Sequence, residues 1–136
     1  MLCSEIYAKT GQAIDRLQVK YGDVWASAHG GGAGGPVSCT FASRIIRVKL
    51  TTSTHMGGFV NGLEFVTQDG KSCRIGFWVW DGTAEAVTLD LHHPGYYLSF
   101  LSGGIGKWTP SITVVNPLSF HWSPVKEEGT TRWFME

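Results

Sequence analysis

The chain has 136 residues, enough for a single domain with one hydrophobic core. Eleven Lys and Arg residues balance eleven Asp and Glu residues, which removes the electrostatic reason to expect binding to nucleic acid or to an anionic membrane surface. Charged residues make up only 16% of the chain beside 18 glycines and six tryptophans, and this composition favours strands and turns over long helices.

Alternating apolar and polar residues predict a series of short strands along the chain. Residues 3–9 are the only segment that reads as a helix, and they are too short to form a stable one. Strands are predicted at residues 14–19, 24–28, 44–50, 59–67, 71–80, 84–91, 96–101, 111–115 and 118–122. Turns are predicted at Gly22-Asp23, Asp69-Gly70 and Asp81-Gly82. A total of about eleven or twelve strands, with no linker between them, predicts one all-β domain that is a barrel, a sandwich or a prism.

The cysteines and the first residues bear on the compartment. Cys3, Cys39 and Cys73 are an odd number with no CxxC spacing, which predicts small, partly buried thiols in a reducing compartment rather than a disulfide framework or a zinc site. Residues 1–5 lack the basic region and apolar stretch of a signal peptide, and no apolar run approaches the roughly 18 residues of a membrane span. We therefore expect cytoplasmic residence, and leave open non-classical secretion or a place within a longer chain.

A weak internal repeat runs through the sequence. Residues 11–19 (GQAIDRLQV) are similar to residues 57–65 (GGFVNGLEF), and residues 115–120 form a looser third copy after an expected loop at residues 103–110. The first two copies begin with a glycine, and each copy places an acid or its amide before alternating apolar residues. Three similar units in one β domain predict pseudo-threefold symmetry.

The order of these motifs resembles the jacalin-related lectins, including the zymogen-granule type and griffithsin-like algal lectins. The resemblance is carried by IDRLQVKYGDVWASAHGGGAGGPVSCTF from residue 14, LEFVTQDGKSCRIG from residue 63, YYLSFLSGG from residue 96 and LSFHWSP from residue 118. It implies the fold of that family, the β-prism I, in which three four-stranded Greek-key sheets surround a pseudo-threefold axis. Residues 1–136 are then a single lectin-like domain.

The start of the chain departs from the family pattern. Family members usually open with a glycine-rich loop and a first strand, which this sequence lacks at its start, whereas residues 128–134 (EGTTRWF) resemble that opening. We expect residues 124–136 to supply the missing strand, as in a circular permutation, because the termini of a closed β fold often lie side by side. The alternative is a disordered tail.

The resemblance also implies a sugar site in the first repeat. Mannose-binding members combine the Asp of a GxxxD loop with backbone N–H groups of a glycine-rich loop. A carboxylate accepts two hydrogen bonds from neighbouring sugar hydroxyls, and glycine lets N–H donors approach the ring closely. The residues implied at this site are Gly11, Gln12, Ala13, Ile14, Asp15, Gly34 and Gly35. Ala13 stands where the family often has Tyr or Trp, so an aromatic stacking contact is missing.

Weaker second and third sites are implied in the other repeats. Asparagine replaces the aspartate there, which keeps an acceptor but loses the charge. The residues concerned are Gly58, Asn61 and Gly82 in the second repeat, and Trp108, Asn116 and Gly129 in the third. Trp108 is expected in a loop, either as a binding contact or as an ordinary surface residue.

Simpler interpretations of the first site remain open. The Asp15 side chain either binds a ligand, caps a turn, or pairs with Arg16 or Lys20 on the surface. The glycine run at residues 30–35 is either a sugar cradle or only a flexible hairpin loop.

Catalytic and metal-binding patterns are not recognisable. The histidines His92, His93 and His121 lack a metal-ligand spacing, and no carboxylate pair has the arrangement of a glycosidase. We therefore expect neither an enzyme nor a cofactor or metal.

The resulting hypothesis is a carbohydrate-binding lectin module for mannose or glucose units. Galactose-type members use a free glycine terminus made by cleavage, which this sequence does not offer. A homodimer or a tandem array would raise the affinity of a single shallow site. The alternative is a jacalin-like domain for protein interaction or targeting that has lost sugar binding.

Overall fold

The computed structural model describes residues 2–54, 58–109 and 112–125. Its strands are β1 Cys3–Thr10, β2 Ile14–Tyr21, β3 Val24–Trp25, β4 His29–Gly30, β5 Gly35–Thr40, β6 Ile45–Ser53, β7 Val60–Thr67, β8 Ser72–Gly76, β9 Ala86–His92, β10 Tyr96–Thr109 and β11 Ile112–Pro124. In these ranges no helix has the length and apolar character needed to cross a bilayer.

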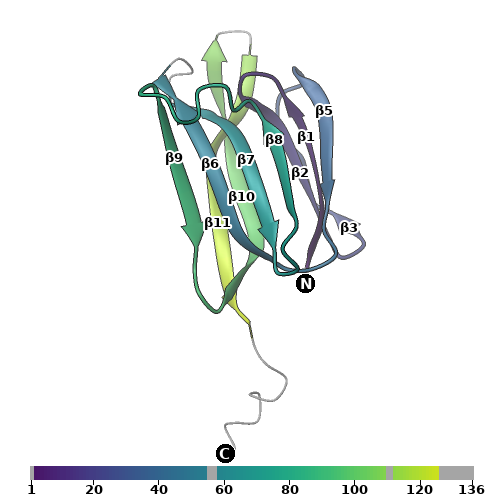
Figure 1. Cartoon of the computed structure of the whole chain (residues 1–136). Coiled ribbons are helices and arrows are strands. Elements are labelled where there is room, and N and C mark those ends of the chain that lie inside the picture. The colour runs from purple at the N-terminus through teal and green to yellow at the C-terminus, as the bar shows by residue number, and fades with distance from the viewer. Residues whose placement is uncertain (1, 55–57, 110–111, 126–136) are drawn as a thin grey trace, which may run out of the picture.

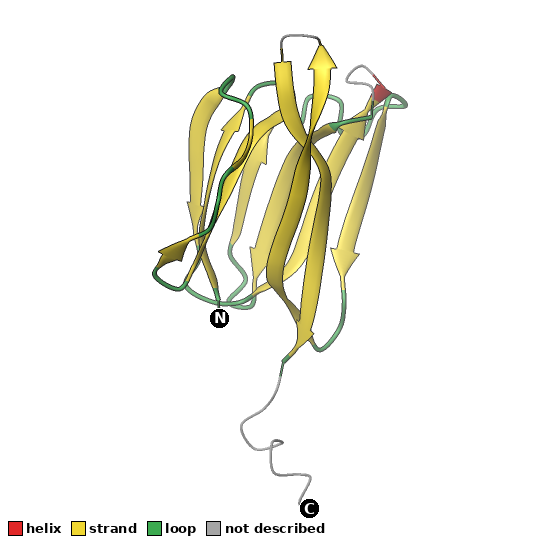
Figure 2. Cartoon of the chain, turned by 180° about the vertical axis from the view of Figure 1, so that it is seen from behind, coloured by secondary structure: helices red, strands yellow, loops and turns green. Residues whose placement is uncertain are grey.

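The strands form three antiparallel sheets around a shared interior (Figures 1 and 2). Sheet A has the order β3-β2-β1-β5, with β4 also paired to β2; sheet B has the order β8-β7-β6-β9; sheet C consists of β10 and β11. The structure confirms the expected β-prism. Within the described residues the sheets hold five, four and two strands rather than four each. Sheet A has a fifth strand because β4 also pairs with β2, and sheet C consists of two long, bulged strands of 14 and 13 residues.

Two strands near the start of the chain were not predicted from the sequence. Residues 3–9 form β1, which lies between β2 and β5 and buries Ile6 and Ala8 completely. Pairing on both sides therefore overrides the weak local preference of this segment. The strand β5 was not predicted, because the preceding glycine run hides the short alternation that follows it.

The loop expected at residues 103–110 is also wrong where the structure describes it. Residues 103–109 continue β10 and pair with β11, so Trp108 lies in a strand. The two separate strands predicted at residues 111–115 and 118–122 are likewise parts of the single strand β11. Bulges near Ser99 and Gly104 let the long hairpin bend along the prism without a break in pairing.

The three repeats meet at one end of the molecule. A small cluster there buries Ala13 and Val114, with Phe59 and Trp80 packed against them. Ala13, Phe59 and Val114 each stand two residues before the repeat position occupied by Asp15, Asn61 or Asn116. One residue from each repeat therefore contributes to the same cluster, as the predicted pseudo-threefold symmetry requires.

The prediction that all three cysteines are free thiols is wrong. Cys39 in β5 and Cys73 in β8 form a disulfide, with their Cα atoms 6.1 Å apart. The bond joins an edge strand of sheet A to an edge strand of sheet B. An odd cysteine count gave no sign of this pair, since only the packing of the two sheets brings these edges together. Cys3 is free and buried, and burial raises the pKa of its thiol to about 12.

Candidate functional site

The carboxylate of Asp15 lies beside the predicted glycine loop. Asp15 is the second residue of β2 and only 4% exposed. A Cβ atom placed on Gly34 would lie 2.7 Å from Asp15 Oδ2, and one on Gly11 would lie 3.6 Å from the same oxygen. The structure thus brings together three of the predicted site residues, and Gly34, with φ of +87°, occupies a backbone conformation that suits only glycine.

The loop is also bound to the main chain of Asp15. The Gly31 N–H donates to the Asp15 carbonyl oxygen over 2.7 Å. A Cβ atom on Gly30 would lie only 2.1 Å from that oxygen, so any larger residue would displace the loop. These contacts show close packing, which the interpretation as a merely flexible hairpin loop does not predict.

Two cationic side chains hold the carbonyl groups of this loop. Arg16 Nη1 lies 3.4 Å from the carbonyl oxygens of both Gly30 and Gly31, and Lys9 Nζ lies 3.3 Å from that of Gly32. Sequence reasoning missed this role, because the contacts depend on the path of the loop across β1 and β2.

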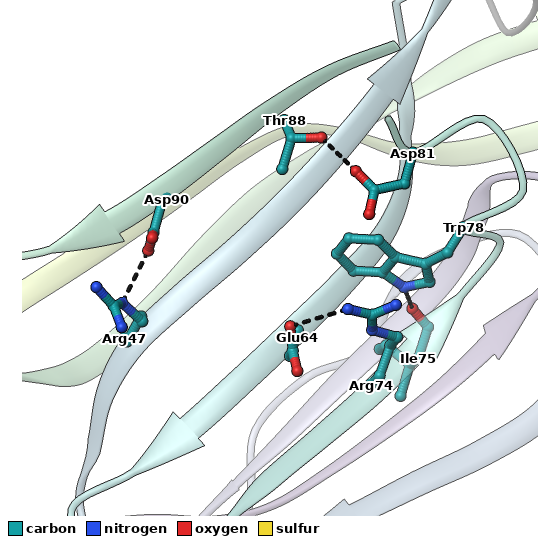
Figure 3. Close-up of polar contacts among 8 residues, drawn as sticks. All are labelled: Arg47, Glu64, Arg74, Ile75, Trp78, Asp81, Thr88 and Asp90. Atoms are coloured by element: carbon teal, nitrogen blue, oxygen red, sulfur yellow. Dashed lines mark hydrogen bonds and ion pairs between the residues drawn. The ribbon is translucent and has the colours of Figure 1, made fainter. Parts of the chain in front are cut away.

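The ion pairs of the described residues lie elsewhere, on the outer face of sheet B. They join Arg47 to Asp90 and Arg74 to Glu64 (Figure 3). Asp15 belongs to neither pair, so the interpretation of Asp15 as a surface ion-pair partner has no support in this part of the chain.

Burial governs the electrostatics of Asp15. Desolvation raises the pKa of its carboxyl group above the ordinary aspartate value, and a backbone hydrogen bond from Gly11 acts in the opposite direction as the smaller effect. The carboxylate therefore takes up a proton more readily than a surface aspartate.

The remaining residues of the predicted first site differ in accessibility. Gln12 is exposed and Gly35 pairs with Thr10 at the start of β5, whereas Ala13 and Ile14 are each 1% exposed. The Ala13 side chain is enclosed in the cluster of the three repeats, so this position belongs to the core.

The second repeat copies the backbone of the first without its cradle. The Phe77 N–H donates to the Asn61 carbonyl oxygen over 2.9 Å, and a Cβ on Gly76 would lie 2.3 Å from that oxygen, as at Gly30. Gly58 and Gly82, by contrast, have no atom within 4 Å of an added Cβ. The structure therefore does not hold these two predicted residues against Asn61.

Asn61 instead links the second repeat to the first by a hydrogen bond. Its side chain is 1% exposed, and Nδ2 donates to the Gln12 carbonyl oxygen over 2.7 Å. This contact fixes the β1–β2 turn that carries the first site. The sequence alone does not reveal it, because the two residues are 49 positions apart.

The third repeat is less complete. Asn116 lies half-buried in β11, and a Cβ atom on Gly106 would lie 3.1 Å from Asn116 Cβ. Asn116 therefore packs against strand β10 rather than facing a glycine loop. Gly129, the loop glycine predicted for this site, lies outside the described residues.

The histidines do not assemble a metal site in the part of the chain that is described. There, no group of three or more His, Cys, Asp or Glu side chains is placed to hold an ion. His121 instead shares a hydrogen bond of 2.9 Å between Nε2 and Ser102 Oγ.

The similarities of this chain to known proteins are similarities of structure. No family model matches the sequence, and no curated protein matches it. A prostate-specific WGA16 glycoprotein lectin has a TM-score of 0.68 at 18% identity, over 93% of this chain and 85% of that protein. Jacalin in complex with melibiose, Gal-alpha(1-6)-Glc, has a TM-score of 0.66 at 19% identity, over 90% and 92% of the two chains.

A mannose-binding jacalin-related lectin from Ananas comosus is similar to the same degree. Its TM-score is 0.66 at 17% identity, over 92% of this chain and 84% of that one. The fold is that of the jacalin-related lectins. In this jacalin-like prism the Asp15 site lies at the end where the three repeats converge.

The contact between Gly34 and Asp15 can be tested with two matched alanine variants of the jacalin-like prism. Gly34 and Gly82 have similar positive φ values of +87° and +84°, but only Gly34 is crowded. We expect Gly82→Ala to cost about 1 kcal/mol of unfolding free energy from backbone strain alone. Gly34→Ala should cost at least about 1 kcal/mol more, measured by urea unfolding. Equal losses in the two variants would contradict the close packing described above.

Proposed function

We propose that this chain is a non-enzymatic carbohydrate-binding domain whose site is formed by Asp15, Gly11 and Gly34. The observation that carries the proposal is the approach of the Gly34 backbone to Asp15 Oδ2. This arrangement provides a carboxylate acceptor beside a glycine backbone, and a pair of sugar hydroxyls requires both. The lectins that share the fold support the same function, and protein hydrogen bonds alone suffice, without a metal.

The proposed ligands are glycans with mannose or glucose units. Gly11 lies within the chain, and its N–H donates to the Ala13 carbonyl oxygen over 3.0 Å, so this glycine offers no free amino group to a sugar. The lectin from Ananas comosus is mannose-binding, while jacalin carries a galactose-containing disaccharide, so the fold is compatible with either sugar. A single site of this kind binds weakly, and a homodimer or a tandem array would supply avidity.

A second candidate function is that of a protein-interaction domain that no longer binds sugar. It is favoured by the state of the repeats: Asn61 uses its amide internally, and Gly58 and Gly82 stand apart from it. The low exposure of Asp15 points the same way, since a ligand would reach little of its carboxylate.

A glycan array separates the two functions. The protein is displayed in multivalent form, so that weak single sites give a measurable signal. Binding to mannose- or glucose-terminated glycans, with little signal from galactose-terminated ones, is the expected result. Preference for galactose would contradict the ligand class but not the lectin function, whereas silence across the array at high protein concentration would favour the interaction domain.

A further inference from the structure

Strand β9 presents an apolar face that the described residues leave uncovered. Thr88 and Asp90 point to the outer face of sheet B, where they contact Asp81 and Arg47 (Figure 3). The alternate residues Val87 and Leu89 therefore face the interior side of the sheet, yet they are 58% and 48% exposed. Inward-facing apolar side chains with this exposure indicate that the described residues do not complete the layer of the prism that faces β9.

A groove of about 550 Å³ runs between β9 and β11 beside this face. Its apolar lining comes from Leu91 on β9, Tyr96 at the start of β10, and Phe120 and Trp122 on β11. The groove marks the seam between sheets B and C. The seam between sheets A and B, in contrast, is closed by the Cys39–Cys73 disulfide.

Among the described strands, only β10 pairs with β11, so the other edge of β11, which borders this groove, has main-chain groups without a strand partner there. The Tyr21 hydroxyl accepts from the Leu101 N–H over 3.0 Å and lies 3.5 Å from the Leu101 carbonyl oxygen, so the main chain of Leu101 points away from β11. Leu101 pairs with Phe120, and antiparallel partners of this kind both point outward. The N–H and C=O of Phe120, and of Trp122 two residues later, therefore face the groove.

The chain leaves the described part at the foot of the same groove. Pro124 pairs with Tyr96, and the Val125 N–H donates to the Gly95 carbonyl oxygen over 2.8 Å. The eleven residues that follow span up to about 36 Å when extended, whereas a strand along the seven residues of β9 needs only about 23 Å. They include Gly129, suited to a turn, and then residues 130–134 (TTRWF), which are β-branched or aromatic at four of five positions.

We propose that residues 130–134 turn back along β11, pair with its free edge and fill the groove against β9 as a third strand of sheet C. The pairing is local in sequence, so little loop entropy opposes it. An aromatic side chain of this segment would then cover the exposed inner face of β9. This strand would be the one that the sequence predicts within residues 124–136, of which only residues 124 and 125 are described.

Hydrogen exchange in the full-length protein tests the pairing directly. We expect the amides of Phe120 and Trp122 to be protected, and the variants Thr131→Pro and Trp133→Ala to speed their exchange by about tenfold or more. Trp25→Ala is the matched control, because Trp25 is a 40% exposed tryptophan in sheet A and its loss should leave these amides unchanged.

Several results would overturn the proposal. Fast exchange of both amides in the unmodified protein, or equal exchange in all variants, would exclude pairing by this segment. Protection that disappears on dilution would show that a second copy of the chain occupies the groove instead. Sugar binding should be unaffected by Thr131→Pro, so failure here is distinguishable from failure of the proposed function. The Gly31 main chain that is bound to Asp15 packs against Thr113 near the start of β11, whereas Pro124 ends that strand.

Discussion

Asp15→Asn is expected to weaken binding to the preferred glycan by about 10- to 100-fold while the protein stays folded. The substitution keeps the size of the side chain but removes the negative charge, and a hydrogen bond to a charged group contributes about 1.5–3 kcal/mol. Burial raises the pKa of Asp15, which means that burial disfavours the ionised carboxylate in the folded state. Replacing it by a neutral amide should therefore not lower the free energy of unfolding. Calorimetric titration together with urea unfolding measures both quantities.

Asp23→Asn is the matched control for this experiment. Asp23 is exposed in the turn between β2 and β3, so its loss should change neither binding nor stability. If Asp15→Asn binds as tightly as the unmodified protein, the sugar site lies elsewhere, even if the lectin function holds.

The pH dependence of binding follows from the same residue. The folded-state pKa of Asp15 lies above the ordinary aspartate value, so glycan affinity should decline as the pH falls through that raised pKa. Fold stability changes in the opposite direction. As the pH falls through the raised pKa, the free energy of unfolding should increase, because the folded state binds the Asp15 proton more tightly than the unfolded state does. In Asp15→Asn this part of the pH profile should be flat.

Replacing both Cys39 and Cys73 by alanine is expected to lower the free energy of unfolding by about 3–4 kcal/mol. The disulfide closes a loop of 34 residues, and the cost reflects the freedom that the unfolded chain regains without it. For a domain of this size the loss corresponds to a fall in Tm of roughly 10–15 °C. Calorimetric melting under non-reducing conditions measures the difference.

Cys3→Ala serves as the control for the loss of a buried sulfur. Cys3 is 3% exposed and free, so this variant should lose only about 1 kcal/mol. If the double variant has the same Tm as the unmodified protein, the cross-link between sheets A and B does not stabilise the fold. Disulfides persist mainly in oxidising compartments, and cytoplasmic residence stays a prediction of the sequence alone.

Much of the architecture was predictable from local patterns. The alternation in residues 44–50 and 59–67, and the Asp69-Gly70 turn that follows, correspond to β6, β7 and the start of β8. The spacing of Asp15, Asn61 and Asn116 predicted the threefold arrangement. These features depend on neighbours along the chain, since side-chain alternation and turn chemistry are local properties.

The candidate site was predictable only in outline. The sequence identified Asp15 and the glycine loop through their resemblance to a motif, and the structure places Gly34 and Gly11 against that carboxylate. It did not show that Ala13 is a core residue or that Asn61 links the second repeat to the first. Both outcomes depend on which repeats meet at the axis, and a repeat pattern in one dimension does not specify that contact.

By itself, the sequence determined that this is a neutral, glycine-rich β domain with three repeated units and one repeat whose acid is intact. Tertiary structure alone decided that Cys39 meets Cys73, that the loop carbonyls are held by Lys9 and Arg16, and that sheet C leaves a groove beside β9. The physical reason is the separation along the chain between the residues that interact. Turns and alternation arise within a few residues, whereas these contacts form only when the edges of separate sheets are brought together by a shared core.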